Sequence, residues 1–144
     1  MSDKTACQLP LSGGCQSGGV RYEIPAAPVR VYVCHCLECR KQSASVFGIS
    51  VWVRRADFTL LSGAPRSWSR STDSGRMLDC AFCPECGSRL WHEYTGGTSE
   101  FLTLKGGSLD APVDLRGVPH VWVKRKLPGV IIPDGVRQFE GNPI

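Results

Sequence analysis

Six of the eight cysteines of this 144-residue chain are crowded into two short segments, CHCLECRK and CAFCPECGS. The first segment has the spacing C-x-C-x-x-C, and the second places its cysteines at steps of three. The N-terminal sequence lacks the apolar core of a signal peptide, so we expect a reducing, cytoplasmic compartment. Many cysteines in such a compartment indicate metal binding or catalysis rather than a disulfide framework.

The first segment predicts a metal site made by Cys34, Cys36 and Cys39. With only one or two residues between them, three thiolates can converge on one zinc ion at about 2.3 Å. The fourth position is either open, as in catalytic zinc sites, or closed by a residue from elsewhere. His35 is not expected to be a ligand, because neighbouring residues of an extended segment point to opposite sides. Arg40 and Lys41 follow directly; they either attract an anionic substrate and lower thiol pKa values, or belong to a solvated turn.

The second segment contains a C-P-x-C-G knuckle at Cys83 and Cys86, which predicts half of a tetrahedral zinc site. A redox pair is the weaker interpretation, because no βαβ pattern surrounds the two cysteines. Cys15, in the glycine-rich stretch SGGCQSGG, is the expected third ligand, since its glycines let the backbone approach a metal closely. The fourth ligand stays open, because a serine, whose hydroxyl is hard to ionise, stands two residues after Cys15. The candidates are Cys80, which we place first, and then Cys7, Ser17 and water.

Short β-rich runs, separated by glycine and proline, make up most of the chain. These runs alternate or are rich in valine and aromatic residues, which favours strands. They cover 20–24, 29–34, 46–53, 58–63, 77–83, 89–94, 101–107 and 120–125. The best helix candidate, 36–45, is about two turns long. We therefore predict one mainly β domain over 1–144, with antiparallel β-sheets, little helix and the tail 133–144 on its surface. Four tryptophans are expected in the core: Trp52, Trp68, Trp91 and Trp122.

Charge and hydropathy narrow the range of partners. No apolar run approaches the ~20 residues of a membrane-spanning helix, so no membrane association is expected. The net charge is only +4, from 17 basic and 13 acidic residues, and no run of Lys or Arg forms a tail. Nucleic-acid binding is not indicated, because phosphate binding normally shows as a clustered basic patch.

Taken in order, several segments resemble the family of glutathione-dependent formaldehyde-activating enzymes, which includes centromere-protein-V-like proteins. The segments are GGCQSGGVRYE, CHCLECRKQSASVFG, SGAPRSWSRS, FCPECGSRLW, LKGGSLDAP, PHVWV and a tail ending in FEGNP. The resemblance implies a β-tent fold, in which antiparallel sheets pack around zinc-binding knuckles. It implies a catalytic zinc held by Cys34, Cys36 and Cys39. It also implies a structural zinc held by Cys15, Cys83 and Cys86. Ser17 replaces a family cysteine in the structural site, and we hypothesise that Cys80, which stands where the family pattern favours arginine, compensates.

The resemblance further implies a carbon–sulfur lyase that joins the thiol of glutathione to formaldehyde, giving S-(hydroxymethyl)glutathione, or runs in reverse. In this interpretation zinc binds the thiol as a thiolate, which attacks the aldehyde. The alternatives are the same zinc chemistry on a different thiol adduct, or a non-catalytic zinc-stabilised binding module. The expected partners are a glutathione-like thiol and a small aldehyde, and the oligomeric state is left open. Further candidates for binding carboxylates or moving protons are Arg21, Arg54, His92 and His120.

Overall fold

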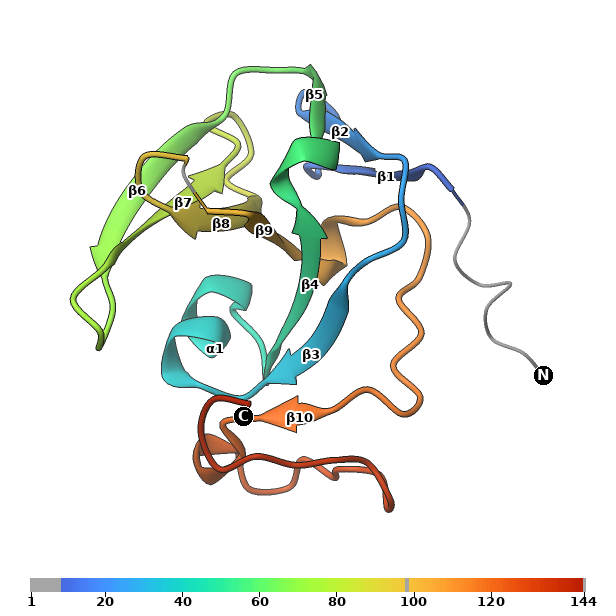
Figure 1. Ribbon diagram of the computed structural model, residues 1–144, viewed down its shortest axis with the longest axis vertical. Coiled ribbons are helices and arrows are strands. Elements are labelled where there is room, and N and C mark those ends of the chain that lie inside the picture. The colour runs from blue at the N-terminus through green and yellow to red at the C-terminus, as the bar shows by residue number, and fades with distance from the viewer. Residues whose placement is uncertain (1–8, 98, 144) are drawn as a thin grey trace.

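The computed structural model describes residues 9–97 and 99–143. They form two β-sheets and one short helix, joined by turns and loops (Figure 1). The strands are β1 Leu11–Gly14, β2 Arg21–Ile24, β3 Arg30–Cys34, β4 Gly48–Arg54, β5 Thr59–Ser62, β6 Arg66–Ser71, β7 Met77–Phe82, β8 Arg89–Tyr94, β9 Phe101–Lys105 and β10 His120–Val121. The helix α1 spans Leu37–Ser43, and the single-turn 3-10 segments are η2 Arg55–Asp57, η3 Gly106–Ser108 and η4 Val123–Arg125. No helix in this part of the chain is long and apolar enough to cross a membrane.

The larger sheet has seven strands in the order β10-β3-β4-β9-β8-β7-β6, and the smaller sheet has three in the order β1-β2-β5. Among these strands, every pairing is antiparallel except that of β10 with β3. The prediction of a mainly β fold with antiparallel sheets and one two-turn helix is therefore confirmed. The parallel edge strand β10 is an addition that the sequence did not indicate.

The main hydrophobic core lies between the two sheets. Alternation along β2 places Tyr22 and Ile24 on the inner face of the smaller sheet, where both are fully buried. They belong to one cluster with Leu90, Leu102 and Leu104, which come from β8 and β9 of the larger sheet. Burying each such side chain contributes roughly 1.5–3 kcal/mol, so this layer holds the two sheets together.

Two strands, β1 and β6, lie outside the runs expected from the sequence. β1 has the sequence LSGG, and a Cβ on its Gly13 would come within 2.5 Å of the Tyr22 hydroxyl. A strand of small residues can approach its neighbour this closely, but it carries no hydrophobic alternation. β6 is the edge strand RSWSRS, which is almost entirely exposed and therefore gives no hydrophobic signal either. The run 120–125 is also only partly strand, because its second half forms η4.

The four tryptophans do not share one environment. Trp91 is in the main core, whereas Trp52 and Trp122 are half-buried against a second hydrophobic cluster around Tyr32. The placement of Trp68 in the core was wrong, because 55% of this residue is exposed. Trp68 lies on the edge strand β6, where the Arg89 guanidinium stands 5.9 Å from the centre of its ring.

The C-terminal segment runs beside β10, as expected for a tail on the surface (red in Figure 1). Backbone hydrogen bonds run from Trp122 N to Gly141 O and from Val123 N to Phe139 O. Because β10 pairs with β3, the tail lies close to the end of β3, where the first cysteine segment begins.

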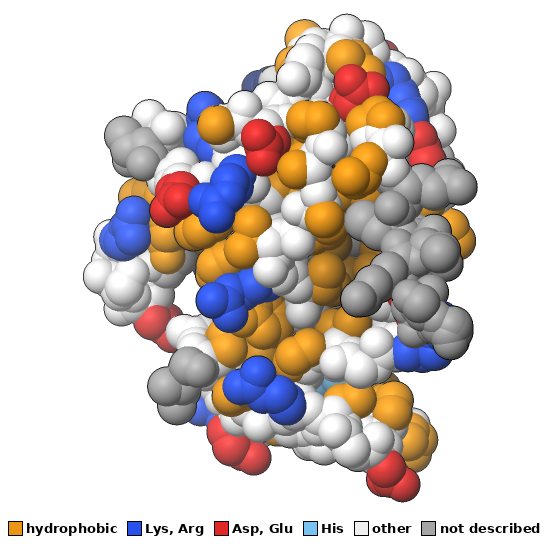
Figure 2. Space-filling model, turned by 45° about the vertical axis from the view of Figure 1, so that its right-hand side comes forward, with side chains coloured by type: hydrophobic (Ala, Val, Ile, Leu, Met, Phe, Trp, Pro, Cys, Tyr) orange, Lys and Arg blue, Asp and Glu red, His pale blue; other side chains and the backbone are white. Residues whose placement is uncertain are grey.

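Charged side chains are mixed on the face that Figure 2 shows. Hydrophobic side chains occupy a central band there, and Lys and Arg lie among Asp and Glu rather than in one large patch. Ion pairs such as Arg54 with Glu100 and Arg55 with Glu93 offset part of the basic charge. The expectation that nucleic acid is not a partner stays a prediction.

Removing the Tyr22 hydroxyl should weaken the contact between the sheets. This hydroxyl is buried and lies 2.6 Å from Ser108 Oγ, so we expect Tyr22→Phe to lower the free energy of unfolding by about 1–2 kcal/mol at pH 7. Burial also raises the pKa of Tyr22 from 10.0 to about 12. Between these pH values the unfolded chain loses a proton that the folded chain keeps, so stability falls as pH rises, and Tyr22→Phe should lack this part of the fall. Urea unfolding at several pH values measures both effects. A double-mutant cycle with Ser108→Ala that gives no coupling energy would contradict this assignment.

Candidate functional site

The first cysteine cluster forms where β3 ends and α1 begins. Cys34 is the last residue of β3, Cys36 is the N-cap of α1, and Cys39 lies in the first turn of the helix. The Cys39 backbone N–H donates to Cys36 Sγ at 3.3 Å, which satisfies one of the free donors at the helix start. The helix packs closely on β4, because a Cβ on Gly48 would lie only 3.0 Å from Cys39 Cβ. The three Sγ atoms lie within 4.8 Å of one another, so the structure brings together the trio that the spacing indicated.

The electrostatics of this first cluster favour a bound cation. Contacts with the thiols of Cys34 and Cys39, and with backbone N–H groups, lower the pKa of Cys36 to about 2. Contacts with Cys36 and Cys39, together with burial, raise the pKa of Cys34. Sulfurs this close cannot all be thiolates unless a cation lies among them, because like charges repel. Three thiolates are a ligand set that suits zinc, so these residues fit a metal ion of that class.

His35 points away from the thiols and contacts β10. Its Nε2 lies 2.8 Å from His120 Nδ1, and the two rings stack with their centres 5.1 Å apart. Both imidazoles are buried, and burial lowers both pKa values, that of His35 to about 4. The two histidines are thus neutral at pH 7. Their contact joins His120 of β10 to His35, which lies between Cys34 and Cys36 of the first cluster.

The second cluster connects the two sheets. Cys15 lies in the turn between β1 and β2, and Cys83 and Cys86 lie in the turn between β7 and β8. Gly87, with a φ of +81°, turns the chain back, and its N–H donates to the Cys83 carbonyl at 2.8 Å. The three Sγ atoms again lie within 4.8 Å of one another, so this second trio also meets as the sequence indicated.

Ser17, not Cys80, is the candidate fourth ligand that lies beside the second cluster. Ser17 Oγ is 3.3 Å from Cys15 Sγ and 4.0 Å from Cys83 Sγ. Cys80 does not belong to the cluster, which corrects the preference given to it above. It stands opposite His92 in the sheet, so these two side chains share a face, whereas Ala81 and Cys83 belong to the main core. Cys7 lies outside the described residues.

A cavity of about 700 Å³ reaches both clusters. Its wall includes Cys39 from the first cluster, and Cys15 and Cys86 from the second. Two basic residues, Arg89 and Lys105, also line it. The volume falls in the range of roughly 300–1,000 Å³ that is usual for small-molecule sites.

Comparison with known proteins agrees with this geometry. The family model described as glutathione-dependent formaldehyde-activating enzyme matches residues 10–125. The chain belongs to this family. The fold is also similar to the crystal structure of a Rhodobacter sphaeroides protein, with a TM-score of 0.56 and 22% sequence identity over 76% of this chain and 99% of that chain. A search of curated proteins gave no match.

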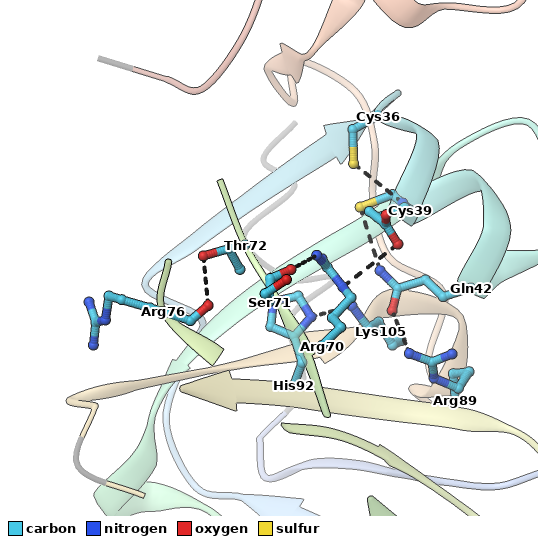
Figure 3. A network of polar contacts seen from close by, with 11 residues as sticks. Cys36, Cys39, Gln42, Arg70, Ser71, Thr72, Arg76, Arg89, His92 and Lys105 are labelled. Atoms are coloured by element: carbon cyan, nitrogen blue, oxygen red, sulfur yellow. Dashed lines mark hydrogen bonds and ion pairs between the residues drawn. The ribbon is translucent and has the colours of Figure 1, made fainter. Parts of the chain in front are cut away.

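In this member of the formaldehyde-activating enzyme family, polar contacts link the first cluster to Arg89, one of the two basic residues of the cavity (Figure 3). Gln42 of α1 donates from Nε2 to Cys39 Sγ at 3.7 Å and accepts from Arg89 Nη2 at 3.4 Å. Lys105 Nζ donates to His92 Nδ1 at 2.6 Å. Burial lowers the pKa of His92 well below its usual value and lowers that of Lys105 to about 8. At pH 7 a neutral imidazole therefore accepts a hydrogen bond from a largely charged ammonium group.

Four basic candidates named from the sequence are not part of the cavity wall. Arg40 and Lys41 lie in the last turn of α1, where positive charge interacts favourably with the helix C-terminus. Arg21 and Arg54 form ion pairs with acidic side chains. Among the basic residues, the cavity instead brings Arg89 and Lys105 near Cys39.

Sequence reasoning missed Arg89, Lys105 and Gln42 in this formaldehyde-activating enzyme relative. Arg89 opens β8 one residue beyond the knuckle, after Ser88, and Lys105 closes β9 before two glycines. Both lie in segments that carry the family resemblance. The sequence signal that could have pointed to them is a basic residue next to a conspicuous motif, the knuckle for Arg89 and a glycine pair for Lys105. Their nearness to each other comes from the pairing of β8 with β9, which no local pattern reveals.

Proposed function

We propose that this protein catalyses the reversible addition of a thiol of the glutathione class to formaldehyde, with zinc held by Cys34, Cys36 and Cys39. In the reverse direction the reaction is that of a carbon–sulfur lyase. The observation that carries the proposal is the cavity of about 700 Å³ that has Cys39 in its wall together with two basic side chains. Family membership supports the same substrates.

The ligand set supports an exchangeable position for the substrate thiol. Among the described residues, no further His, Cys, Asp or Glu joins the first cluster. Zinc bound there would lower the pKa of a thiol in its fourth position and so supply a nucleophilic sulfur at neutral pH. The Gln42 amide donates to Cys39 Sγ, and the helix N-cap contact fixes Cys36, so both ligands are oriented by α1. A non-catalytic module, in contrast, would be expected to close the fourth position with a protein ligand.

Arg89 is the residue we assign to the carboxylate of the substrate. Glutathione carries two carboxylates, and a guanidinium binds a carboxylate through paired, charge-assisted hydrogen bonds. Arg89 lines the cavity, and Gln42 accepts from its Nη2, which holds the guanidinium beside the first cluster. Asp110, an acidic residue of the same cavity wall, is paired with Arg21.

Lys105 is the residue we assign to proton transfer. As the sulfur lone pair forms the C–S bond, the carbonyl π electrons move to oxygen, and the Lys105 ammonium donates the proton that gives the hydroxymethyl group. In the reverse direction the Lys105 amine removes that proton, the C=O bond re-forms and the C–S bond breaks. A pKa of about 8 suits a group that must donate and accept near neutral pH. His92 holds the ammonium group in place through the 2.6 Å contact.

The proposal is tested by exchange NMR on glutathione and formaldehyde with the zinc-loaded protein. Because the uncatalysed addition is itself facile, the result expected is a rate of interconversion that rises in proportion to protein concentration above the buffer rate. An unchanged rate would remove the formaldehyde assignment. Repeating the measurement with other thiols and small aldehydes then defines the substrate class.

An Arg89→Gln variant should discriminate less between thiols that do and do not carry a carboxylate. We expect its KM for glutathione to rise about tenfold or more, because one charge-assisted contact is worth about 1.5–3 kcal/mol. The KM for cysteamine, which has no carboxylate, should stay nearly constant. The matched control is Lys41→Gln, because Lys41 is exposed and lies outside the cavity wall. Equal effects of the two substitutions on KM for glutathione would exclude Arg89 as the carboxylate-binding residue.

A further inference from the structure

The second cluster has an oxygen, and not a fourth sulfur, as its additional neighbour. Ser17 Oγ lies 3.3 Å from Cys15 Sγ and 4.0 Å from Cys83 Sγ, while the Ser17 backbone N–H donates to Cys86 Sγ at 3.4 Å. Ser17 thus touches all three cysteines. Among the described residues, no further His, Cys, Asp or Glu completes this cluster.

The serine hydroxyl is a weak and replaceable ligand. It is neutral at physiological pH, and its oxygen already accepts a hydrogen bond from Gly19 N at 3.3 Å. Closed zinc sites use four nitrogen or sulfur ligands, whereas three protein ligands are typical of sites that exchange their fourth. A thiolate from solution is a stronger donor to such a metal than a hydroxyl is.

Solvent can reach this corner of the cluster. Gln16, Ser17, Gly18 and Gly19 are all exposed, whereas Cys15 is buried beneath them. A Cβ added to Gly18 would meet no heavy atom within 4 Å, which indicates open space beside the Ser17 turn. A small ligand can therefore approach without a rearrangement of the sheets.

We propose that Cys15, Cys83 and Cys86 bind a metal ion with an exchangeable fourth position at Ser17, and that a small thiol from solution binds there. The thiol gives its proton to solvent as its sulfur replaces the serine oxygen, so the protein would have a second thiol-binding site outside the reaction proposed above. This inference requires metal binding by the second cluster but does not depend on any activity with formaldehyde.

Cobalt(II) in place of zinc gives a direct readout, because its thiolate charge-transfer absorption reports the number of bound sulfurs. The full-length Cys36→Ser/Cys39→Ser variant, which lacks two ligands of the first cluster, is loaded with cobalt(II) under a phosphine reductant and titrated with 2-mercaptoethanol. We expect a saturable rise of about one third in this absorption, from three thiolates to four. The same protein carrying Ser17→Cys should start at the higher value and should not respond.

In the cobalt titration, the proposal would be overturned by no response in the protein with Ser17, or by an equal response after Ser17→Cys. Zinc release to a chelator supplies a second measurement on the otherwise unaltered chain. Wild type should lose its second-cluster zinc at least about tenfold faster than Ser17→Cys, since a fourth thiolate closes the site. Equal release rates would mean that the fourth position is already closed. Formaldehyde exchange is not part of either measurement, so failure here and failure of the proposed enzyme activity remain distinct.

Discussion

A Cys36→Ser variant should bind about one metal ion per chain where wild type binds about two, and it should accelerate thiol–formaldehyde exchange no more than buffer does. The substitution removes one of three sulfurs that lie within 4.8 Å of one another. Serine is itself a favoured N-cap, so α1 should still begin at residue 37 and the loss should be one of metal rather than of helix. Elemental analysis of the purified protein and exchange NMR measure the two effects. Full catalysis by this variant would contradict the proposed function.

Cys80→Ser is the matched control for that result. Cys80 is as deeply buried as any cysteine that the structure describes, with 1% of its surface exposed, yet it belongs to neither cluster. This variant should therefore keep about two metal ions per chain and the exchange rate of wild type. Loss of one ion would instead make Cys80 a ligand of the second cluster and would contradict the assignment of the fourth position to Ser17.

The cysteine clusters could be predicted from the sequence because their geometry is mostly local. A strand that runs into a helix N-cap over six residues brings Cys34, Cys36 and Cys39 together whatever the rest of the chain does. The knuckle of Cys83 and Cys86 is likewise a single turn closed by one glycine. Cys15 could be assigned to the second cluster only from its glycine-rich surroundings and the family pattern, because no local rule predicts that it lies near Cys83 and Cys86.

The cavity could not be predicted, because its wall is assembled from segments that meet only through sheet pairing. Arg89 and Lys105 come from neighbouring strands, and α1 contributes Gln42 between Arg89 and Cys39. Cys80 stands apart from the second cluster because of strand alternation: it lies three residues before Cys83, and side chains an odd number of residues apart on a strand point to opposite faces. Cys80 accordingly pairs with His92, whereas Ala81 and Cys83 belong to the main core.

The two clusters differ in what they hold together, and this difference predicts different consequences of losing them. The first cluster closes a loop within one segment, from the end of β3 to the first turn of α1. The second ties the turn between β1 and β2 to the turn between β7 and β8, and 66 residues separate Ser17 from Cys83. A cross-link that closes a long loop restricts the unfolded chain more than one that closes a short loop. The loop-entropy relation used for disulfides gives about 4 kcal/mol for this span and about 2 kcal/mol for the six residues of the first cluster.

Cys83→Ser should therefore lower the free energy of unfolding by several kcal/mol, whereas Cys36→Ser should leave most of it intact. Cys83 is 1% exposed in the main core, so its loss also leaves a hydroxyl in an apolar site. Binding of a metal to the folded chain alone stabilises it by an amount that grows with metal concentration, so urea unfolding in zinc buffers separates the two contributions. Wild type should gain stability from zinc at both clusters, Cys36→Ser from the second cluster alone and Cys83→Ser from the first cluster alone. A Cys83→Ser protein as stable as wild type, with the same zinc dependence, would mean that the two sheets are held by their apolar core alone.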